Sequence, residues 1–597
     1  MLPALRALRE QALALEDHYA ADVEAVEAGY RPSARNLLHY LSLRQNDIRP
    51  LQEDLAALGL SSLGVSEPHA LASLNAVIGI LERLSGEAPS VEPVPPVDFR
   101  SGPLLLRDHA RALLGPEPLR RASRIMVTMP TEAATNGVLV RDLLAAGMDV
   151  MRINLAHDGP EEWHAMVRHL REAEKTVGRI CRVQADLGGP KLRTGPIAPI
   201  GRALRVAPKR DGLGRVIAPA RVWLSAGPGG PLTRLQSIPV DARLLSGAQV
   251  GDRLLFRDTR GRRRWFELAD VSEGAAIGTC ARTAWVPSGG EVRRLRGDEE
   301  LASGVFGDLP EVIAPILLKP KDVLELTREP LPGVPAGANV EASPARIHLT
   351  LETAFECVRP GHRVWIDDGK IGGVVESNDG SVIRLRVTHT APTGARLKAE
   401  KGVNFPDTQF TMPALTAVDR ANLREAVAFA DMVALSFLRG PEDVLALEDE
   451  LHALGAGNLG IVLKIETASA FEHLPRILLA SLRSPPVGVM VARGDLAVEV
   501  GFERLSEVQE EILWLCEAAH VPVIWATQVL EGMAKTGSAS RAEVTDAAMS
   551  HRAECAMLNK GPNIVETVSF LRGILSRMET HQRKRRAMLR PLSVSRL

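Results

Sequence analysis

The feature that most constrains the fold is an alternation of short apolar runs with helical patterns, broken once in the middle of the chain. From residue 124, the runs RIMVTM, DVMRIN and RICRVQAD alternate with amphipathic segments such as PEEWHAMVRHLREAEKTVG. The alternation stops near residue 196 and resumes near residue 415, with DMVALS, IVLKIE, VGVMVARGD, PVIWATQ and ECAMLN. Strands that alternate with helices predict parallel βα units. Three such units precede the interruption and five follow it.

Eight βα units over about 250 residues are typical of a closed (β/α)8 barrel and favour it over an open, doubly wound sheet. The barrel is expected to comprise residues 123–195 and 406–588, followed by a tail at 589–597. In such barrels the chemistry lies at the carboxyl ends of the strands. The residues that follow each apolar run are therefore the candidates for a site.

The interruption, residues 196–405, is rich in Gly and Pro and carries short alternating strands and hairpin signals such as SNDGS. It predicts an all-β domain inserted after the third barrel strand. Within it, ARVWLSAG and IPVDARLLSGAQVGDRLLFRD resemble ARIHLTLETAFECVRPGHRVWIDD in order and spacing. A duplicated β-module and a chance likeness of two β-rich segments both remain open.

Residues 1–122 differ from the rest of the chain because they show helical periodicity and almost no strand signal. ARNLLHYLSLRQNDIRPLQEDLAAL is a good amphipathic helix pattern, and EAPSVEPVPPVDF has the composition of a linker. The region is predicted to be a helical extension. Docking on the barrel and a role in assembly, including a homo-oligomer, both stay open.

Composition excludes several classes of function. The net charge is −1, so no global field favours nucleic acid or a membrane surface as a partner. The five cysteines are scattered without a CxxC pair, which indicates a reducing compartment and neither disulfides nor a zinc site. No apolar run approaches the roughly 20 residues of a membrane span, and acidic residues interrupt the first helix pattern early. A cytoplasmic protein is expected.

Polar side chains, together with one glycine, cluster at the carboxyl ends of the second to seventh predicted strands. They are Arg152, Asn154, His157, Asp186, Lys191, Arg193, Ser436, Arg439, Lys464, Glu466, Arg493, Gly494, Asp495, Thr527 and Gln528. Each has an ordinary structural explanation, such as a salt bridge for a cation or a helix cap for a carboxylate. Their joint occurrence on one rim favours a site.

Glu466 and Asp495 end adjacent strands, so their oxygens can share one divalent ion. Mg²⁺ suits one or two carboxylates with substrate oxygens completing the octahedron. Arg152, Arg193 and Lys464 would neutralise a phosphoryl group and a developing oxyanion. The rim therefore predicts phosphoryl or enolate chemistry assisted by a metal.

The sequence segments that carry these residues resemble motifs of the pyruvate kinase family. MRINLAH is similar to its ARxNxSH, ADLGGPKLRTG to its DTKGPEIRTG, and EKGVNFP to its KKGVNLP. LSFLR, KIET, VARGDL, WATQVLEGM and SRAEVTDA also match in order. The resemblance covers about residues 124–195 and 350–572, and it includes the position of the inserted β domain.

The resemblance implies transfer of a phosphoryl group from phosphoenolpyruvate to ADP, giving pyruvate and ATP. Lys464 would stabilise the enolate and bridge the transferring group, and Thr527 would help deliver a proton. Glu466 and Asp495 would hold Mg²⁺ or Mn²⁺. The implied substrate and phosphate residues are Arg152, Arg193, Ser436, Gly494, Asp495 and Thr527. The implied nucleotide residues are Asn154, His157, Asp186 and, from the closing β domain, Lys401.

The chain departs from the family pattern at the monovalent cation site. Family members that need potassium bind it with Asn, Ser, Asp and Thr, but the Ser position is Ala156 and the Thr position is Leu187. The glutamate of GPEIRTG is replaced by Lys191, whose ammonium would serve as a surrogate for the cation. Activity without potassium is therefore expected. The alternative is that Lys191 points to solvent and the site is degraded.

Other departures lie on the nucleotide side and at the end of the chain. The lysine of DTKGP is Gly188, the TIGPAS turn becomes TMPTEA, and MLSGETAKGDYP is reduced to MLNKGPN. The family's C-terminal αβ domain has no counterpart after the last barrel helix, so regulation through it is not expected.

Two other functions remain alternatives. One is a metal-dependent aldolase or lyase acting on a 2-keto acid, although the retained GVNFP segment argues against it. The other is a non-catalytic regulatory derivative, whose signature would be the loss of Lys464, Glu466, Asp495 or Thr527. All four are present.

Overall fold

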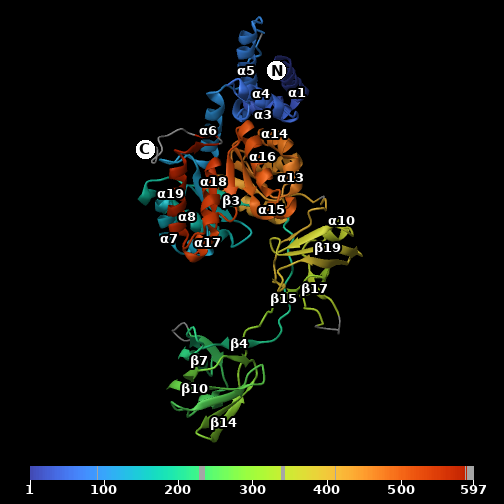
Figure 1. The fold of residues 1–597 in the computed structure, drawn as a ribbon. Helices are drawn as coiled ribbons and strands as arrows, with labels where there is room; N and C mark the ends of the chain where they lie inside the picture. Colours follow the sequence, from blue (N-terminus) through green and yellow to red (C-terminus); the bar gives the residue numbers. More distant parts are fainter. Residues whose placement is uncertain (91, 228–234, 338–342, 411, 585, 588–597) are drawn as a thin grey trace. The chain divides into compact units, whose positions relative to one another are not determined.

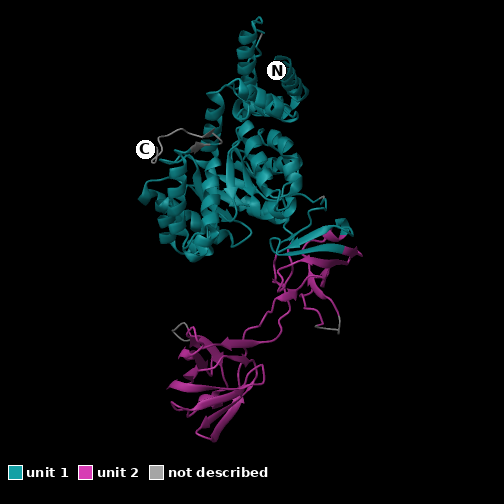
Figure 2. Cartoon of the chain, in the orientation of Figure 1, with its two compact units in different colours: residues 1–192, 356–375, 402–597 teal, residues 193–355, 376–401 magenta. Residues whose placement is uncertain are grey.

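The computed structural model describes residues 1–90, 92–227, 235–337, 343–410, 412–584 and 586–587. The predicted tail at 589–597 lies outside these residues. The chain divides into two compact units, residues 1–192, 356–375 and 402–597 in one, and residues 193–355 and 376–401 in the other (Figure 2). Each unit is described by itself.

The first unit contains a closed parallel barrel (Figure 1). Its strands, in order around the barrel, are β1 (Arg124–Thr128), β2 (Val150–Asn154), β3 (Arg182–Asp186), β23 (Met432–Leu435), β24 (Gly460–Ile465), β25 (Val487–Ala492), β26 (Val523–Ala526) and β27 (Cys555–Leu558). β27 pairs in parallel with β1 and closes the ring. The predicted (β/α)8 fold is confirmed, with three strands before the insert and five after it.

Helices surround this barrel. They are α7 (Gly137–Ala146), α8 (Pro160–Val177), α11 (Ala417–Ala426), α12 (Pro441–Ala453), α13 (Ala468–Glu472), α14 (Leu474–Ser481), α15 (Arg493–Val500), α16 (Leu505–Ala518), α17 (Glu531–Thr536), α18 (Arg541–Met549) and α19 (Ile564–Met578). Val183 and Ala185 of β3 belong to the core between strands and helices, whereas Val150 and Met126 belong to a separate core with residues of the other strands. Both faces of the strands are covered, which explains their continuous apolar runs.

Helix α6 (Ser101–Leu114) packs its last turn into the barrel core. Leu113 is 2% exposed and shares a core cluster with Met126, Val150 and Met490. A Cβ added at Gly460 or Gly488 would lie 2.5 or 2.4 Å from a methyl group of Leu113. Gly460 of β24 and Gly488 of β25 therefore leave the space that the Leu113 side chain fills.

The N-terminal region consists of α1 (Leu2–His18), α2 (Ala20–Ala25), α3 (Arg31–Arg44), α4 (Arg49–Ala57) and α5 (Ala70–Ser85). It has its own core, which includes Leu5, Leu55 and Ile78. Helix α3 lies against α16 of the barrel (Figure 1). Asn36 Nδ2 donates to the carbonyl of Ala518 at 2.8 Å. Of the two roles left open for this region, docking on the barrel is the one the structure displays.

His520 lies in this contact, where Nδ1 is 2.9 Å from Ser33 Oγ and Nε2 is 3.0 Å from the carbonyl of Pro68. Burial lowers the pKa of His520 to about 4 from its ordinary value of 6.5. Below pH 6.5 the imidazole is protonated in the unfolded chain, whereas in the folded chain it stays neutral until the pH approaches 4. The contribution of the neutral imidazole to the free energy of unfolding is therefore fully present above pH 6.5 and is lost as the pH falls toward 4.

We expect this imidazole to remove about 3 kcal/mol from the free energy of unfolding between pH 6.5 and 4. Urea denaturation at a series of pH values measures the loss. His520→Gln replaces the imidazole donor and acceptor with those of an amide, which does not titrate, so the stability of this variant should fall less over the same range. Parallel pH profiles of the two proteins would contradict the prediction.

The insert contains two segments with the same order of elements. In the first, β7 (Ala220–Ser225) pairs in parallel with β8 (Gln236–Pro239), and α9 (Ala242–Leu245) follows. The chain continues as an antiparallel meander of β9 (Arg253–Arg257), β10 (Arg263–Ser272) and β11 (Ala275–Cys280). β11 then pairs antiparallel with β7.

In the second segment, β16 (Val323–Thr327) pairs in parallel with β17 (Ala345–His348), followed by α10 (Thr353–Cys357). β18 (Arg363–Ile366) and β19 (Ile371–Asn378) pair antiparallel, and β20 (Val382–His389) pairs antiparallel with β16. The shared order supports the duplicated-module hypothesis, which stays a prediction. It aligns ARVWLS of β7 with VLELT of β16, so the partner of ARIH is QSIP of β8 rather than ARVWLS.

Short strands complete the insert and its borders. They are β4 (Ala203–Val206), β5 (Lys209–Arg210), β6 (Val216–Ala218), β12 (Ala284–Pro287), β13 (Glu291–Arg296), β14 (Glu299–Val305), β15 (Ile316–Leu318), β21 (Ala395–Leu397) and β22 (Val403–Asn404). In the part of the chain that the structure describes, no helix is long and apolar enough to span a membrane. The five cysteines are all free.

Candidate active site

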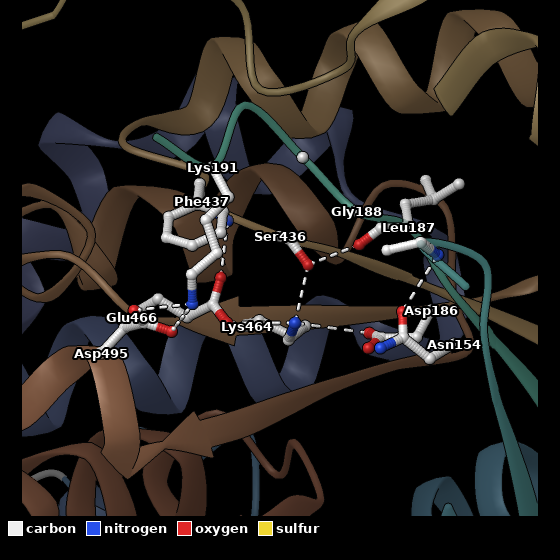
Figure 3. A network of polar contacts seen from close by, with 12 residues as sticks. Asn154, Asp186, Leu187, Gly188, Lys191, Ser436, Phe437, Lys464, Glu466 and Asp495 are labelled. Atoms are coloured by element: carbon white, nitrogen blue, oxygen red, sulfur yellow. Dashed lines mark hydrogen bonds and ion pairs between the residues drawn. The ribbon is translucent and has the colours of Figure 1, made fainter. Parts of the chain in front are cut away.

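Lys464 lies at the centre of a polar network at the carboxyl ends of the barrel strands (Figure 3). It belongs to β24, and its side chain is 10% exposed. Nζ donates to Ser436 Oγ at 2.7 Å and lies 3.0 Å from Glu466 Oε1 and 3.5 Å from Asp186 Oδ1. Ser436 Oγ in turn donates to the carbonyl of Leu187 at 2.6 Å. Side chains from three neighbouring strand ends thus meet at one ammonium.

The surroundings of Lys464 keep it charged. Burial alone lowers the pKa of its ammonium, but the charges of Asp186 and Glu466 outweigh burial and place the pKa above its ordinary value. The barrel therefore holds a fixed positive charge in a site that is largely shielded from water. Such a charge is well suited to stabilise an anion that forms during a reaction.

Glu466 and Asp495, the predicted metal ligands, lie on the same side of Lys464 (Figure 3). Burial raises the pKa of Glu466, Lys464 opposes that shift, and the charge of Asp495 adds to it. The backbone N–H of Phe437 donates to Glu466 Oε2 at 2.8 Å. The Lys191 ammonium lies 3.0 and 2.9 Å from the two oxygens of Asp495.

This pair of carboxylates fits Mg²⁺ or Mn²⁺. Among the residues that the structure describes, no three His, Cys, Asp or Glu side chains form a group that could hold a metal ion. A donor set of two carboxylates suits an ion that retains water and binds substrate oxygens. The Lys191 ammonium already places a positive charge on Asp495, which is the chemistry a cation site requires.

Arg152 and Asn154 of β2 lie beside Asp186. The Arg152 guanidinium donates to Asp186 and, at 2.9 Å, to Thr128 Oγ1. Asn154 Oδ1 accepts from the N–H of Ala156 at 3.1 Å, which closes the turn after the strand. The groups on this side of the network are therefore the guanidinium of Arg152 and the side-chain amide of Asn154.

Thr527 follows β26 in a left-handed conformation with φ 71°, and Gln528 follows with φ 61°. A β-branched residue with positive φ is an outlier of the kind that clusters at functional sites. A Cβ added at Gly494 would lie 3.0 Å from Thr527 Cγ2, so the glycine allows the two segments to approach. Arg493 Nε donates to the carbonyl of Ala526 at 2.7 Å and ties them together.

Two residues of this region were missed by the sequence analysis. Asp419 is 2% exposed, and its Oδ1 accepts from the N–H groups of Gly188 and Gly189 at 2.9 and 3.2 Å. It thereby holds the loop that carries Lys191. The spacing Thr416-x-x-Asp419 signals a capping box, which the structure contains, but it does not reveal the contact with the glycine loop. The other is Phe437, which has φ 56° and whose ring lies 5.4 Å from the Lys191 ammonium.

Several predicted residues are not part of the network. Arg193 and Lys401 belong to the second unit, where Arg193 donates to the carbonyl of Glu400 at 3.2 Å. The structure does not place them relative to the barrel rim. His157 is exposed, and its carbonyl accepts from Trp163 Nε1 at 3.0 Å. Their roles remain predictions.

A cavity of about 720 Å³ adjoins the network. Its walls include Lys191, Phe405, Phe437, Arg439 and Glu499. Burial raises the pKa of Glu499 to about 7, and Asn404 Nδ2 donates to its Oε1 at 3.2 Å. Lys191 and Phe437 thus border both the carboxylate pair and this cavity.

Comparison with known proteins agrees with this geometry. A family model described as "Pyruvate kinase, barrel domain" matches residues 119–209 and 333–562. The chain is similar to the pyruvate kinase of Clostridium acetobutylicum, with 34% identity over 229 residues, which is 38% of this chain and 46% of that protein.

Two further relatives are similarly distant. The pyruvate kinase of Methylorubrum extorquens is 35% identical over 243 residues, covering 39% of this chain and 48% of its own length. That of Schizosaccharomyces pombe is 32% identical over 233 residues, covering 38% and 44%. The chain thus spans about half the length of the curated relatives it matches.

Proposed function

The chain belongs to the pyruvate kinase family, and on that premise we propose that it transfers a phosphoryl group from phosphoenolpyruvate to ADP, giving pyruvate and ATP. The observation that carries the proposal is the position of Lys464. Its charged ammonium lies among Ser436, Asp186 and Glu466 at the end of the barrel where such enzymes act.

In this mechanism Lys464 neutralises the enolate oxygen and the transferring phosphoryl group. Arg152 binds the phosphoryl oxygens from the side of Asp186, and Ser436 orients Lys464. Thr527 helps to deliver a proton through water to the enolate carbon. Mg²⁺ or Mn²⁺, bound by Glu466 and Asp495, would supply additional positive charge to the substrate oxygens.

The nucleotide side of the proposal rests on the family pattern. Asn154, His157 and Asp186 would line the nucleotide phosphates, with Lys401 and Arg193 contributed by the inserted domain. The protein would work in the cytoplasm without nucleic acid or a membrane as partner.

The test is to incubate the full-length protein with phosphoenolpyruvate, ADP and Mg²⁺, and to measure pyruvate and ATP separately. We expect equal amounts of both products, each requiring ADP. A 2-keto acid lyase would release pyruvate from a substrate without making ATP, and a regulatory derivative would form neither product. Either result would overturn the proposal.

We also expect activity without potassium, because Ala156 and Leu187 lack the side-chain oxygens of the family's cation site and Lys191 brings its own charge. Turnover should be the same with sodium or potassium as the sole monovalent cation at equal ionic strength. Strong stimulation by potassium would overturn this expectation, because it would show that a working potassium site is retained.

A further inference from the structure

Lys191 occupies an unusual position for a residue of a glycine-rich loop. Its ammonium bonds to both oxygens of Asp495, at 3.0 and 2.9 Å (Figure 3). The other predicted ligand, Glu466, has Lys464 as its partner at 3.0 Å. Lys191 thus pairs with one of the two carboxylates that are proposed to bind the divalent metal.

The surroundings of the lysine show that this position is built into the fold. The side chains of Lys191 and Asp495 are 24% and 16% exposed, so the ion pair is mostly shielded from water. The Phe437 ring lies 5.4 Å from the ammonium. A Cβ added at Gly402 would lie 3.1 Å from Lys191 Cε, so glycine leaves room for the lysine stem. An exposed ion pair would have none of these supports.

A divalent ion and this ammonium compete for the same oxygens. Metal–oxygen distances of about 2.0–2.1 Å for Mg²⁺ would put the ion within a few ångströms of an ammonium that is itself bonded to both oxygens of Asp495. Two cations at such a separation repel strongly where water is scarce. Binding of the metal to Asp495 therefore requires Lys191 to leave.

The cavity beside the network provides a place for the displaced side chain. Lys191 already lines this space of about 720 Å³, and Glu499 and Asp407 lie on its walls. Asp407 is paired with Arg363, so Glu499 is the carboxylate there that can accept an ammonium that has left Asp495. The Lys191 side chain is thus bound to Asp495 in the structure, and the adjoining cavity can receive it when it leaves.

We propose that Lys191 is a resident counter-cation that occupies the oxygens of Asp495 until a divalent ion displaces it. This inference rests on the proposed metal site of the proposed function. Lys464 is already the partner of Glu466, and Lys191 gives Asp495 a partner of its own while the metal is absent. The lysine therefore lowers the affinity for the metal by the free energy needed to displace it.

The test is direct binding of Mn²⁺ to full-length protein without phosphoenolpyruvate or nucleotide, with free Mn²⁺ measured by electron paramagnetic resonance. Lys191→Gln should bind Mn²⁺ about tenfold more tightly than the wild type, because the competing charge is removed. Lys191→Arg keeps a cation and should bind near the wild-type affinity. Lys535→Gln removes an exposed lysine paired with Glu531 and is the matched control.

Equal or weaker Mn²⁺ binding by Lys191→Gln would overturn the inference, and thermal melting checks that the variant is folded. Should that variant unfold, Lys191→Met provides the second measurement, because it removes the charge without adding a metal ligand. It should also bind more tightly than the wild type. Since no substrate is present, tighter binding supports the inference even if the protein forms no pyruvate. Failure of the proposed function is detected by a different measurement, the assay of pyruvate and ATP formation.

Discussion

Replacing Lys464 with methionine is expected to reduce the rate of pyruvate formation by about a thousandfold or more, because a preorganised charge at a developing oxyanion is among the largest contributions to catalysis. Methionine keeps much of the side-chain length but cannot neutralise an enolate. The ammonium is held by Ser436 Oγ at 2.7 Å and by Glu466 at 3.0 Å, so no other cation of the network shares its position.

The measurement is the steady-state rate of pyruvate formation under saturating phosphoenolpyruvate, ADP and Mg²⁺. Lys464→Met leaves the buried Glu466 without its ammonium partner and Asp186 with Arg152 alone, so its thermal midpoint must be measured as well. Lys464→Arg keeps the charge and tests whether a fall in rate reflects loss of the cation or of the fold. Lys535→Met serves as the exposed control. A rate within tenfold of wild type for a folded Lys464→Met protein would refute the proposed role.

The second large effect concerns stability and lies at helix α6. Leu113→Ala is expected to lower the free energy of unfolding by about 2–5 kcal/mol, the range for truncating a buried leucine. Gly460 and Gly488 form the space that its methyl groups fill, at 2.5 and 2.4 Å from the positions their own Cβ atoms would take. Backbone on two strands borders the hole, so little relaxation can close it.

Leu104→Ala is the matched control, because Leu104 lies on the same helix but is 45% exposed. Its unfolding free energy should change by less than about 1 kcal/mol. Urea denaturation monitored by tryptophan fluorescence compares both variants with the wild type. Similar stabilities for Leu113→Ala and Leu104→Ala would show that α6 does not help to hold the barrel together.

The interrupted pattern of apolar runs predicted the barrel correctly for a local reason. A strand that is covered on both faces must be apolar at nearly every position, and the residue after such a run must lie at the barrel rim. The positions of Lys464 and Glu466 on one rim follow from that rule, and the structure brings them to 3.0 Å. Their roles in catalysis are still predictions.

The same reasoning could not identify which surface the N-terminal helices cover. An amphipathic pattern states that one face is buried, but it does not state against what. Asn36 bonds to the carbonyl of Ala518, 482 residues away, and Leu113 enters a hole made by two later strands. These contacts depend on packing that no local pattern encodes.

The sequence by itself thus determined the alternation of strands and helices, the place of the insert and the residue types at the rim, because these follow from local burial and strand register. Only the tertiary structure decided what those residues touch. Lys191 was expected to act at a monovalent cation site, and the fold brings its ammonium to Asp495, 304 residues away. Asp419, which holds the loop of that lysine, is likewise distant from it in sequence. The partner of a charged side chain depends on the path of the whole chain, and its spacing in sequence carries no record of that path.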